Sequence, residues 1–246
     1  MTRFVRACAL ALGIAAWPVL AQTYPARPIR LIVGFAPGGA ADLLGRITAQ
    51  ALSDAIGEQV VVDNRPGAGA LIATEIAARA MPDGYTLLFT SPPHAINVAL
   101  YGRAKYDPIK DFEPVIQAVS TALILTANAQ SPFKSVGEMI AYAKANPGKL
   151  SYGSGGSGAT GHLAMELLKS ITRADILHIP YKGTGPVLTD LIGGQIHMTI
   201  GSAAPTLPQV KSGKLRALAV TSKTRSLVLP EVPTLGESGF PAFEGT

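Results

Sequence analysis

Cysteine and tryptophan are nearly absent from this 246-residue chain, which holds one of each, Cys8 and Trp17. A chain of this length has enough apolar residues to form a core, so it can fold without disulfide bonds. Charged residues make up only 15% of the chain against 48% hydrophobic ones, which excludes a disordered acidic or basic tail protein. Beyond the first 21 residues, no apolar run approaches the roughly 20 residues of a membrane-spanning helix.

Glycine and proline are abundant by contrast, with 26 and 19 residues. They follow no triplet period, so collagen and coiled coil are both excluded. Such residues favour tight turns between short elements. At roughly 100 to 200 residues per domain, the length allows one large domain or two small lobes.

The first 21 residues have the pattern of a secretory signal peptide. Arg3 and Arg6 precede an apolar run over 7–20, and Ala21 ends a stretch with the small residues of a cleavage site. We predict cleavage after Ala21, which leaves a mature chain with no cysteine. An exported protein of this composition is typical of the bacterial periplasm, which is the location we predict.

From residue 30 onward, short apolar runs alternate with amphipathic segments, and glycine, proline or asparagine marks each switch. This pattern predicts an α/β fold. A βαβαβ half has strands expected at 31–35, 60–62 and 85–89, and a crossing between lobes is expected within 115–126. In the second series, strands are expected at 150–152, 176–180, 198–200 and 216–221, and helices at 135–146, 160–170, 185–192 and 206–211.

Two loops share one design, in which a strand ends, glycines follow and a helix begins. The first runs over 35–42 and contains Gly38, Gly39 and Asp42, and the second runs over 152–162. Glycines let a ligand approach the backbone, and free N–H groups at a helix N-terminus attract an anion. Both loops are candidate anion sites, and a simple capped turn explains the first loop equally well.

The second loop also matches two other patterns in part. Gly153, Gly155 and Gly158 fit G-x-G-x-x-G after a strand, but they lie in the second half of an exported chain, so an anion-binding turn is the simpler interpretation. Around Ser157, a hydrolase nucleophile elbow fails because Ala159 replaces its last glycine. The four histidines form no zinc motif, so we expect no metal and no cofactor.

Two further loops are candidate walls of a ligand crevice, since ligands of open α/β sheets bind at the carboxyl ends of strands. One contains Ser91, His94 and Asn97, and the other contains Tyr181. A rigid surface turn made by the prolines at 92 and 93 is the alternative for the first of these loops.

In their order and spacing, these segments resemble the Bug/TctC family of extracytoplasmic receptors. The resemblance extends over essentially all of the chain after residue 21. Its motifs include Tyr24-Pro25-Ala26-Arg27-Pro28, Phe35-Ala36-Pro37-Gly38-Gly39, Asn64-Arg65-Pro66-Gly67, Pro82-Asp83-Gly84-Tyr85, His94-Ala95-Ile96-Asn97, Pro180-Tyr181-Lys182-Gly183 and Gly213-Lys214-Leu215-Arg216.

The resemblance implies a two-lobed α/β fold of the type II periplasmic-binding-protein kind, with a ligand cleft between the lobes and no catalysis. Lobe 1 is expected over 22–121 and lobe 2 over 122–224. A segment over 225–246 is expected to return to lobe 1 and to lack the elements that follow in the family. For that reason we expect residues 22–246 alone to be poorly soluble.

The implied function is that of a monomeric receptor, which captures a small carboxylate and delivers it to the membrane subunits of a tripartite tricarboxylate transporter. Nucleic acid is not an expected partner, since the basic residues are scattered. Two alternatives stay open. One is a hydrolase or transferase using Ser154 or Ser157 with His162, and the other is a sensory receptor for a signalling partner.

Carried over, the resemblance implies that the two glycine loops hold a carboxylate across the cleft by backbone N–H groups and ordered waters. Alanines at 40, 41 and 159 and the pair Gly201-Ser202 depart from residues common in the family, which leaves the ligand open. Together with the crevice loops, the candidate ligand-binding residues are Pro37, Gly38, Gly39, Ala40, Asp42, Ser91, His94, Asn97, Ser154, Gly155, Ser157, Ala159, Thr160, Tyr181 and Ser202.

Overall fold

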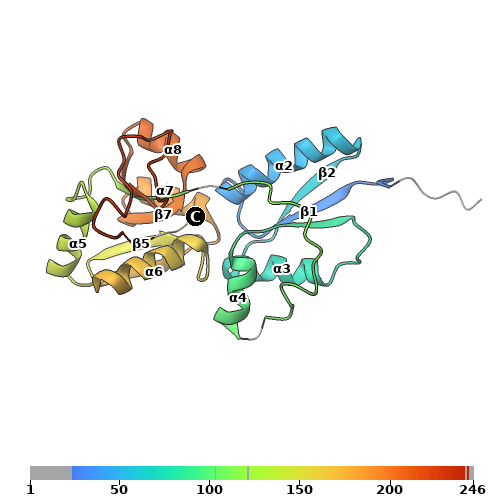
Figure 1. Ribbon diagram of the computed structural model, residues 1–246, viewed down its shortest axis with the longest axis horizontal. Coiled ribbons are helices and arrows are strands. Elements are labelled where there is room, and N and C mark those ends of the chain that lie inside the picture. The colour runs from blue at the N-terminus through green and yellow to red at the C-terminus, as the bar shows by residue number, and fades with distance from the viewer. Residues whose placement is uncertain (1–23, 103, 121, 242, 244–246) are drawn as a thin grey trace, which may run out of the picture.

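The chain folds into two lobes, each built on its own β-sheet with helices packed around it (Figure 1). This computed structural model describes residues 24–102, 104–120, 122–241 and 243, so the predicted signal peptide and its cleavage site lie outside the described residues. Within those ranges, no helix combines the length and apolar character needed to cross a membrane.

The first lobe contains a parallel three-stranded sheet in the order β2-β1-β3. Strand β1 (Ile29–Val33) lies in the centre, between β2 (Val60–Asn64) and β3 (Thr86–Phe89). Ile29 and Leu31 of β1 are buried against Ala49 of the following helix, because a central parallel strand is covered on both faces. The helical elements of this lobe are α2 (Ala40–Ile56), η1 (Ala68–Ala70), α3 (Leu71–Ala78) and α4 (Pro93–Tyr101).

A five-stranded sheet in the order β6-β5-β7-β4-β8 forms the second lobe. Strand β5 is parallel to β6 and β7, whereas β4 is antiparallel to β7 and β8. The strands are β4 (Leu123–Asn128), β5 (Leu150–Ser154), β6 (Ile176–Pro180), β7 (Met198–Ser202) and β8 (Leu215–Val220). The helices are α5 (Val136–Ala145), α6 (Thr160–Thr172), α7 (Thr184–Ile192) and α8 (Ala203–Lys211).

The predicted α/β series is confirmed, with element ends within a few residues of those expected. The predicted start of α5 is one clear case, because the Ser135 hydroxyl caps this helix by accepting a hydrogen bond from the Glu138 N–H at 3.2 Å. Strand β4 was not predicted, and its first residues lie within 115–126, where a crossing between the lobes was expected. Helix α4 was not predicted either. Pro92 and Pro93 suggested a rigid turn, but proline is well tolerated in the first helical turn, where its missing N–H would have no intrahelical partner.

Residues 225–246 were expected to return to the first lobe, but their described part packs on the five-stranded sheet. Leu229 and Val232 are buried against Ile124 of β4 and Val220 of β8. The Val220 N–H donates to the Pro233 carbonyl at 2.9 Å, which ties the segment to the sheet edge. These apolar side chains are covered by β4, β8 and α8, all elements of the second lobe.

Candidate ligand-binding cleft

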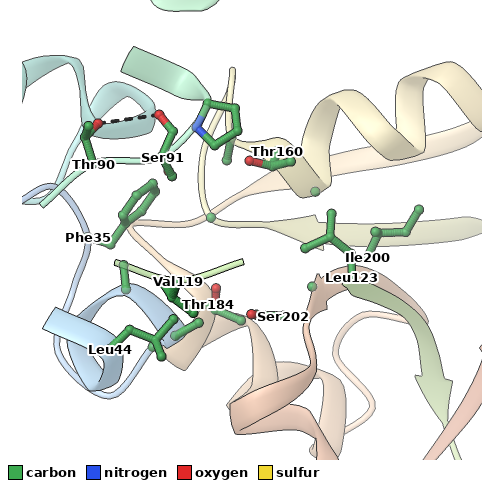
Figure 2. A pocket seen from close by; sticks show the side chains of 18 of the residues that line it. Phe35, Leu44, Thr90, Ser91, Val119, Leu123, Thr160, Thr184, Ile200 and Ser202 are labelled. Atoms are coloured by element: carbon green, nitrogen blue, oxygen red, sulfur yellow. Dashed lines mark hydrogen bonds between the residues drawn. The ribbon is translucent and has the colours of Figure 1, made fainter. Parts of the chain in front are cut away.

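A cleft of about 480 Å³ lies between the two lobes, and both lobes line it (Figure 2). The first lobe contributes the end of β1, the first turns of α2 and the loop after β3. The second lobe contributes the starts of α6, α7 and α8 and the end of β7. The lining residues are Phe35, Gly39, Ala40, Ala41, Leu44, Phe89, Thr90, Ser91, Pro92, Gln117, Val119, Ser120, Leu123, Gly155, Ala159, Thr160, Gly161, Thr184, Val187, Thr199, Ile200, Gly201 and Ser202.

Four helices begin at this cleft: α2, α6, α7 and α8. Their N-cap residues are Gly39, Ala159, Gly183 and Ser202, and none of these four makes a side-chain capping hydrogen bond. Each helix N-terminus carries free N–H groups and about half a positive charge from the helix dipole. The cleft therefore gathers several anion-attracting helix ends in one place.

The partial positive charge of the cleft comes from the backbone at these helix N-termini. Among the described residues that line it, none is aspartate, glutamate, lysine, arginine or histidine. Hydroxyl groups and the amide of Gln117 supply the side-chain polarity. Apolar side chains such as Phe35, Leu44 and Ile200 form the rest of the wall (Figure 2). An anion here would meet N–H donors and hydroxyls beside apolar side chains, whose low polarity strengthens each hydrogen bond.

Ser202 has the most unusual polar atom of the cleft. Only 8% of the residue is exposed, and its Oγ is buried without a hydrogen-bond partner. It occupies the N-cap of α8 without capping that helix. Burying a hydroxyl without a hydrogen-bond partner destabilises the folded protein. A ligand can bond to this atom without breaking a hydrogen bond within the protein.

Hydrogen bonds to backbone carbonyls of the second lobe join the two lobes around the cleft. The Ala36 N–H donates to the Lys182 carbonyl at 2.8 Å, and the Tyr101 hydroxyl donates to the Ser157 carbonyl at 3.1 Å. A methyl group added at Gly183 would lie only 2.9 Å from the Ala36 nitrogen. Glycine at such positions lets the two lobes approach at backbone distance.

The structure brings seven of the fifteen predicted site residues to the cleft surface: Gly39, Ala40, Ser91, Gly155, Ala159, Thr160 and Ser202. The other eight do not line it: Pro37, Gly38, Asp42, His94, Asn97, Ser154, Ser157 and Tyr181. Most of the eight are engaged in contacts that shape the loops around the cleft.

Asp42 holds the first glycine loop instead of facing the cleft. It is 5% exposed, its Oδ2 accepts from the Gly38 N–H at 3.0 Å, and its Oδ1 lies 2.9 Å from Arg46 Nη2. Burial raises the pKa of this carboxyl, but the hydrogen bonds from Arg46 and Gly38 outweigh it and leave the pKa below its ordinary value. Asp42 is thus ionised at neutral pH and fixes the loop at the start of α2.

His94, Asn97 and Tyr181 were predicted as crevice walls, but each makes a hydrogen bond within the protein, while His94 Nδ1 and Asn97 Oδ1 are buried without a partner. His94 Nε2 lies 2.9 Å from the Pro108 carbonyl, and the Asn97 amide donates to the Gly69 carbonyl at 2.9 Å. Tyr181 donates its hydroxyl to Asp190 at 2.6 Å. All three side chains are therefore fixed by hydrogen bonds within the protein, and none of them lines the cleft.

Neither serine of the hydrolase alternative, Ser154 or Ser157, lines the cleft. Ser154 is 1% exposed and does not line it, and its Oγ lies 2.7 Å from Nε2 of His178 rather than near His162. The ring of His162 instead accepts from the Gly158 N–H at 3.2 Å. In the described part of the chain, no group of three histidine, cysteine or acidic side chains is placed to hold a metal ion.

Several lining residues were missed from the sequence. Thr184 follows Gly183 after a strand, the same design as the two glycine loops, so that signal was present and could have identified it. Gln117, Val119 and Ser120 come from the irregular segment that crosses between the lobes, which carries no motif. Only the arrangement in space shows that this segment contributes to the cleft.

Comparison with known proteins agrees with this geometry. Residues 44–246 match the family described as "Tripartite tricarboxylate transporter family receptor". The chain belongs to this TctC family. Over 233 residues it is 43% identical to Protein BugT of Bordetella pertussis, an alignment that covers 94% of this chain and 71% of BugT.

Solved structures of TctC-family relatives share the fold. The R. palustris Rpa4515 structure with adipate is 39% identical, with a TM-score of 0.86 over 90% of this chain and 74% of that one. MatC (Rpa3494) from Rhodopseudomonas palustris with bound malate is 31% identical, with a TM-score of 0.86 over 90% and 76%. The chain is thus a solute receptor of a periplasmic binding-protein family and not an enzyme, and its relatives extend beyond the part that it matches.

Proposed function

We propose that this receptor binds a small dicarboxylate in the cleft between its lobes. The observation that carries the proposal is the convergence of four uncapped helix N-termini on a cleft lined by no charged side chain. Such a site attracts an anion through backbone N–H groups and helix dipoles. A cationic ligand would find no counter-charge there.

The shape of the lining supports a ligand with two polar ends. Apolar side chains, among them Phe35, Leu44 and Val187, alternate around the cleft with hydroxyl and backbone donors. A carbon chain between two carboxylates would lie against the apolar part while each carboxylate meets donors. TctC-family relatives have been solved with adipate and with malate, which are dicarboxylates of this kind.

Within this proposal, the first turns of α2 and α6 hold one carboxylate through the N–H groups near Ala40 and Thr160. The hydroxyl of Thr160 adds a side-chain donor, and Ser91 faces the same space from the first lobe (Figure 2). Ser202 binds the other end of the ligand.

The partner and the location complete the proposal. Export with cleavage after Ala21 places the receptor in the periplasm, where the loaded form meets the membrane subunits of a tripartite tricarboxylate transporter. Family membership supports this partner, and the exported composition supports the location.

A thermal-shift panel on the purified chain tests the proposal. The panel pairs adipate and malate with their neutral diamides, which keep the shape and lose the charge. A dicarboxylate at about 100 times its dissociation constant stabilises the folded state by about 2.7 kcal/mol, whereas its diamide leaves the melting temperature unchanged. Equal shifts for acid and diamide, or no shift with any carboxylate, would overturn the proposal.

A further inference from the structure

A cluster of polar side chains lies behind the second glycine loop, and none of its members lines the cleft. It comprises Tyr152 of β5, His178 of β6, and His162, Glu166 and Lys169 of α6; we call it the histidine cluster. The rings of His162 and His178 are 4.3 Å apart, and His178 stacks on Tyr152 at 4.8 Å. Glu166 accepts from the Tyr152 hydroxyl at 2.6 Å and pairs with Lys169 at 2.7 Å.

Both histidines are bonded to the glycine loop. His162 Nδ1 accepts from the Gly158 N–H at 3.2 Å, and His178 Nε2 lies 2.7 Å from the Ser154 hydroxyl. That hydroxyl in turn accepts from the Gly156 N–H at 3.2 Å. The two rings therefore fix the loop from 154 to 158.

The same loop forms part of the cleft and part of the contact between the lobes. Gly155 lines the cleft, and the chain continues directly into Ala159 and Thr160, which line it as well. The carbonyl of Ser157 accepts the hydroxyl of Tyr101 from the first lobe. A change in the histidine cluster would therefore reach the ligand through one short segment.

The bond to Gly158 fixes the protonation state of His162. A backbone N–H only donates, so Nδ1 of His162 must accept, and the ring is neutral with its proton on Nε2. Protonation would place an N–H against another N–H and break this bond. A charge on His162 would in turn disfavour a second charge on the adjacent ring of His178, since two imidazolium rings this close repel each other.

We propose that His162 and His178 are positioning residues for the anion-binding loop that act in their neutral form, so that protonation of His162 on acidification weakens ligand binding. The proposal rests on the proposed function for its ligand. It assigns these residues no contact with the ligand itself.

The surroundings of the two rings also favour their neutral forms. Burial lowers the pKa of His162, with Glu166 opposing and Lys169 adding to this effect. Burial and the neighbouring His162 lower the pKa of His178 to about 4. Since the ordinary histidine pKa is about 6.5, both rings are neutral at pH 7.5, and the loss of binding is expected below about pH 6.5.

The test is the dissociation constant for adipate, measured by calorimetry between pH 7.5 and pH 5 in the full chain and in the H162N variant. Asparagine keeps an acceptor where Nδ1 lies but does not titrate. Adipate itself begins to protonate in this range, so the two proteins are compared at each pH. From pH 7.5 to pH 5, we expect the affinity of the unsubstituted chain to fall about tenfold more than that of H162N, the cost of about one hydrogen bond.

His197 offers a matched control. Its Nδ1 also accepts a backbone N–H, from Ser151 at 3.1 Å, but at the opposite end of β5 from the glycine loop. The H197N variant should keep the pH dependence of the unsubstituted chain. Identical pH profiles for H162N and the unsubstituted chain, or tighter binding on acidification, would overturn the proposal.

A second measurement separates this proposal from the proposed function. In the ligand-free protein, the amide resonance of Gly158 should shift with the titration of the His162 ring, and this shift should be absent in H162N. If adipate binds at no pH, adipate is not the ligand, and the Gly158 titration alone decides whether the histidine holds the loop. If the chemical shift of the Gly158 amide does not change as the His162 ring titrates, the positioning role is refuted.

Discussion

At the scale of single residues, removing the buried hydroxyl of Ser202 should weaken ligand binding without lowering the stability of the free protein. Because its Oγ has no protein partner, S202A should leave the melting temperature of the free protein unchanged or slightly higher. The dissociation constant for a bound dicarboxylate should rise about five- to tenfold, as expected for one lost hydrogen bond. Calorimetry and a thermal melt on the same sample measure both quantities.

Thr206 is the matched control for Ser202. It lies one turn further along α8, is fully buried, and donates its hydroxyl to the Ser202 carbonyl at 2.9 Å. T206V should lower the melting temperature and keep the affinity within about twofold, since it removes a protein hydrogen bond of about 1 kcal/mol and no ligand contact. If S202A instead costs stability and leaves affinity intact, its hydroxyl serves the fold and not the ligand.

At the scale of elements, close approach of the two lobes depends on the backbone at Gly183, just before α7. Its φ of +139° is unfavourable for other residues, and a methyl group there would lie 2.9 Å from the Ala36 nitrogen in the other lobe. G183A should therefore weaken dicarboxylate binding by more than tenfold, because the lobes cannot close to backbone distance. Titration calorimetry measures this loss.

Gly213 provides the control for backbone strain. Its φ is +74°, and nothing lies within 4 Å of a methyl group added there. G213A should cost about 1 kcal/mol of stability or more through strain alone and leave the ligand affinity unchanged. Equal losses of affinity in G183A and G213A would show that strain, and not lobe contact, explains the effect.

Most elements were predictable because each strand and helix carried its own local signal. The helix expected from residue 135 has Ser135 as its N-cap, and Gly57 ends α2 in the left-handed conformation. Helix α4 was missed because proline signals both turns and helix starts. Within the cleft, glycine loops could be recognised locally, but Gln117 and Ser120 came from a segment without pattern, and only the packing of the lobes places them there.

The predicted site residues that do not line the cleft share one feature. Conspicuous polar side chains such as Asp42, His94 and Tyr181 were expected at the ligand, yet the structure uses them to hold loops and helices. The cleft itself is lined by small, hydroxyl and apolar residues. Where a proposed site consists of backbone N–H groups, the polar side chains that stand out in the sequence hold the surrounding loops and do not line the site itself.

At the scale of the whole molecule, stability should fall on mild acidification. Burial lowers the pKa of His197 as well as those of His162 and His178, the last to about 4. A histidine with a lowered pKa in the folded state adds stability above its unfolded value of about 6.5 and loses it as pH falls through the folded value. The melting temperature should therefore decrease steadily from about pH 6.5 toward pH 4.

Scanning calorimetry across this pH range measures that decrease. In the variant H178Q, whose side chain keeps a hydrogen-bonding group near Ser154 and does not titrate, the slope should be smaller. A melting temperature that is flat or rises between pH 6.5 and pH 4 would contradict burial of neutral histidines.

The central claim is that helix N-termini, not charged side chains, hold the ligand. A crystal structure of the chain with a bound dicarboxylate tests it most directly. The account predicts carboxylate oxygens within about 2.7–3.2 Å of first-turn N–H groups of α2 and α6, with both lobes in contact with one ligand. A carboxylate bound by lysine or arginine side chains, or a ligand outside the cleft, would contradict it.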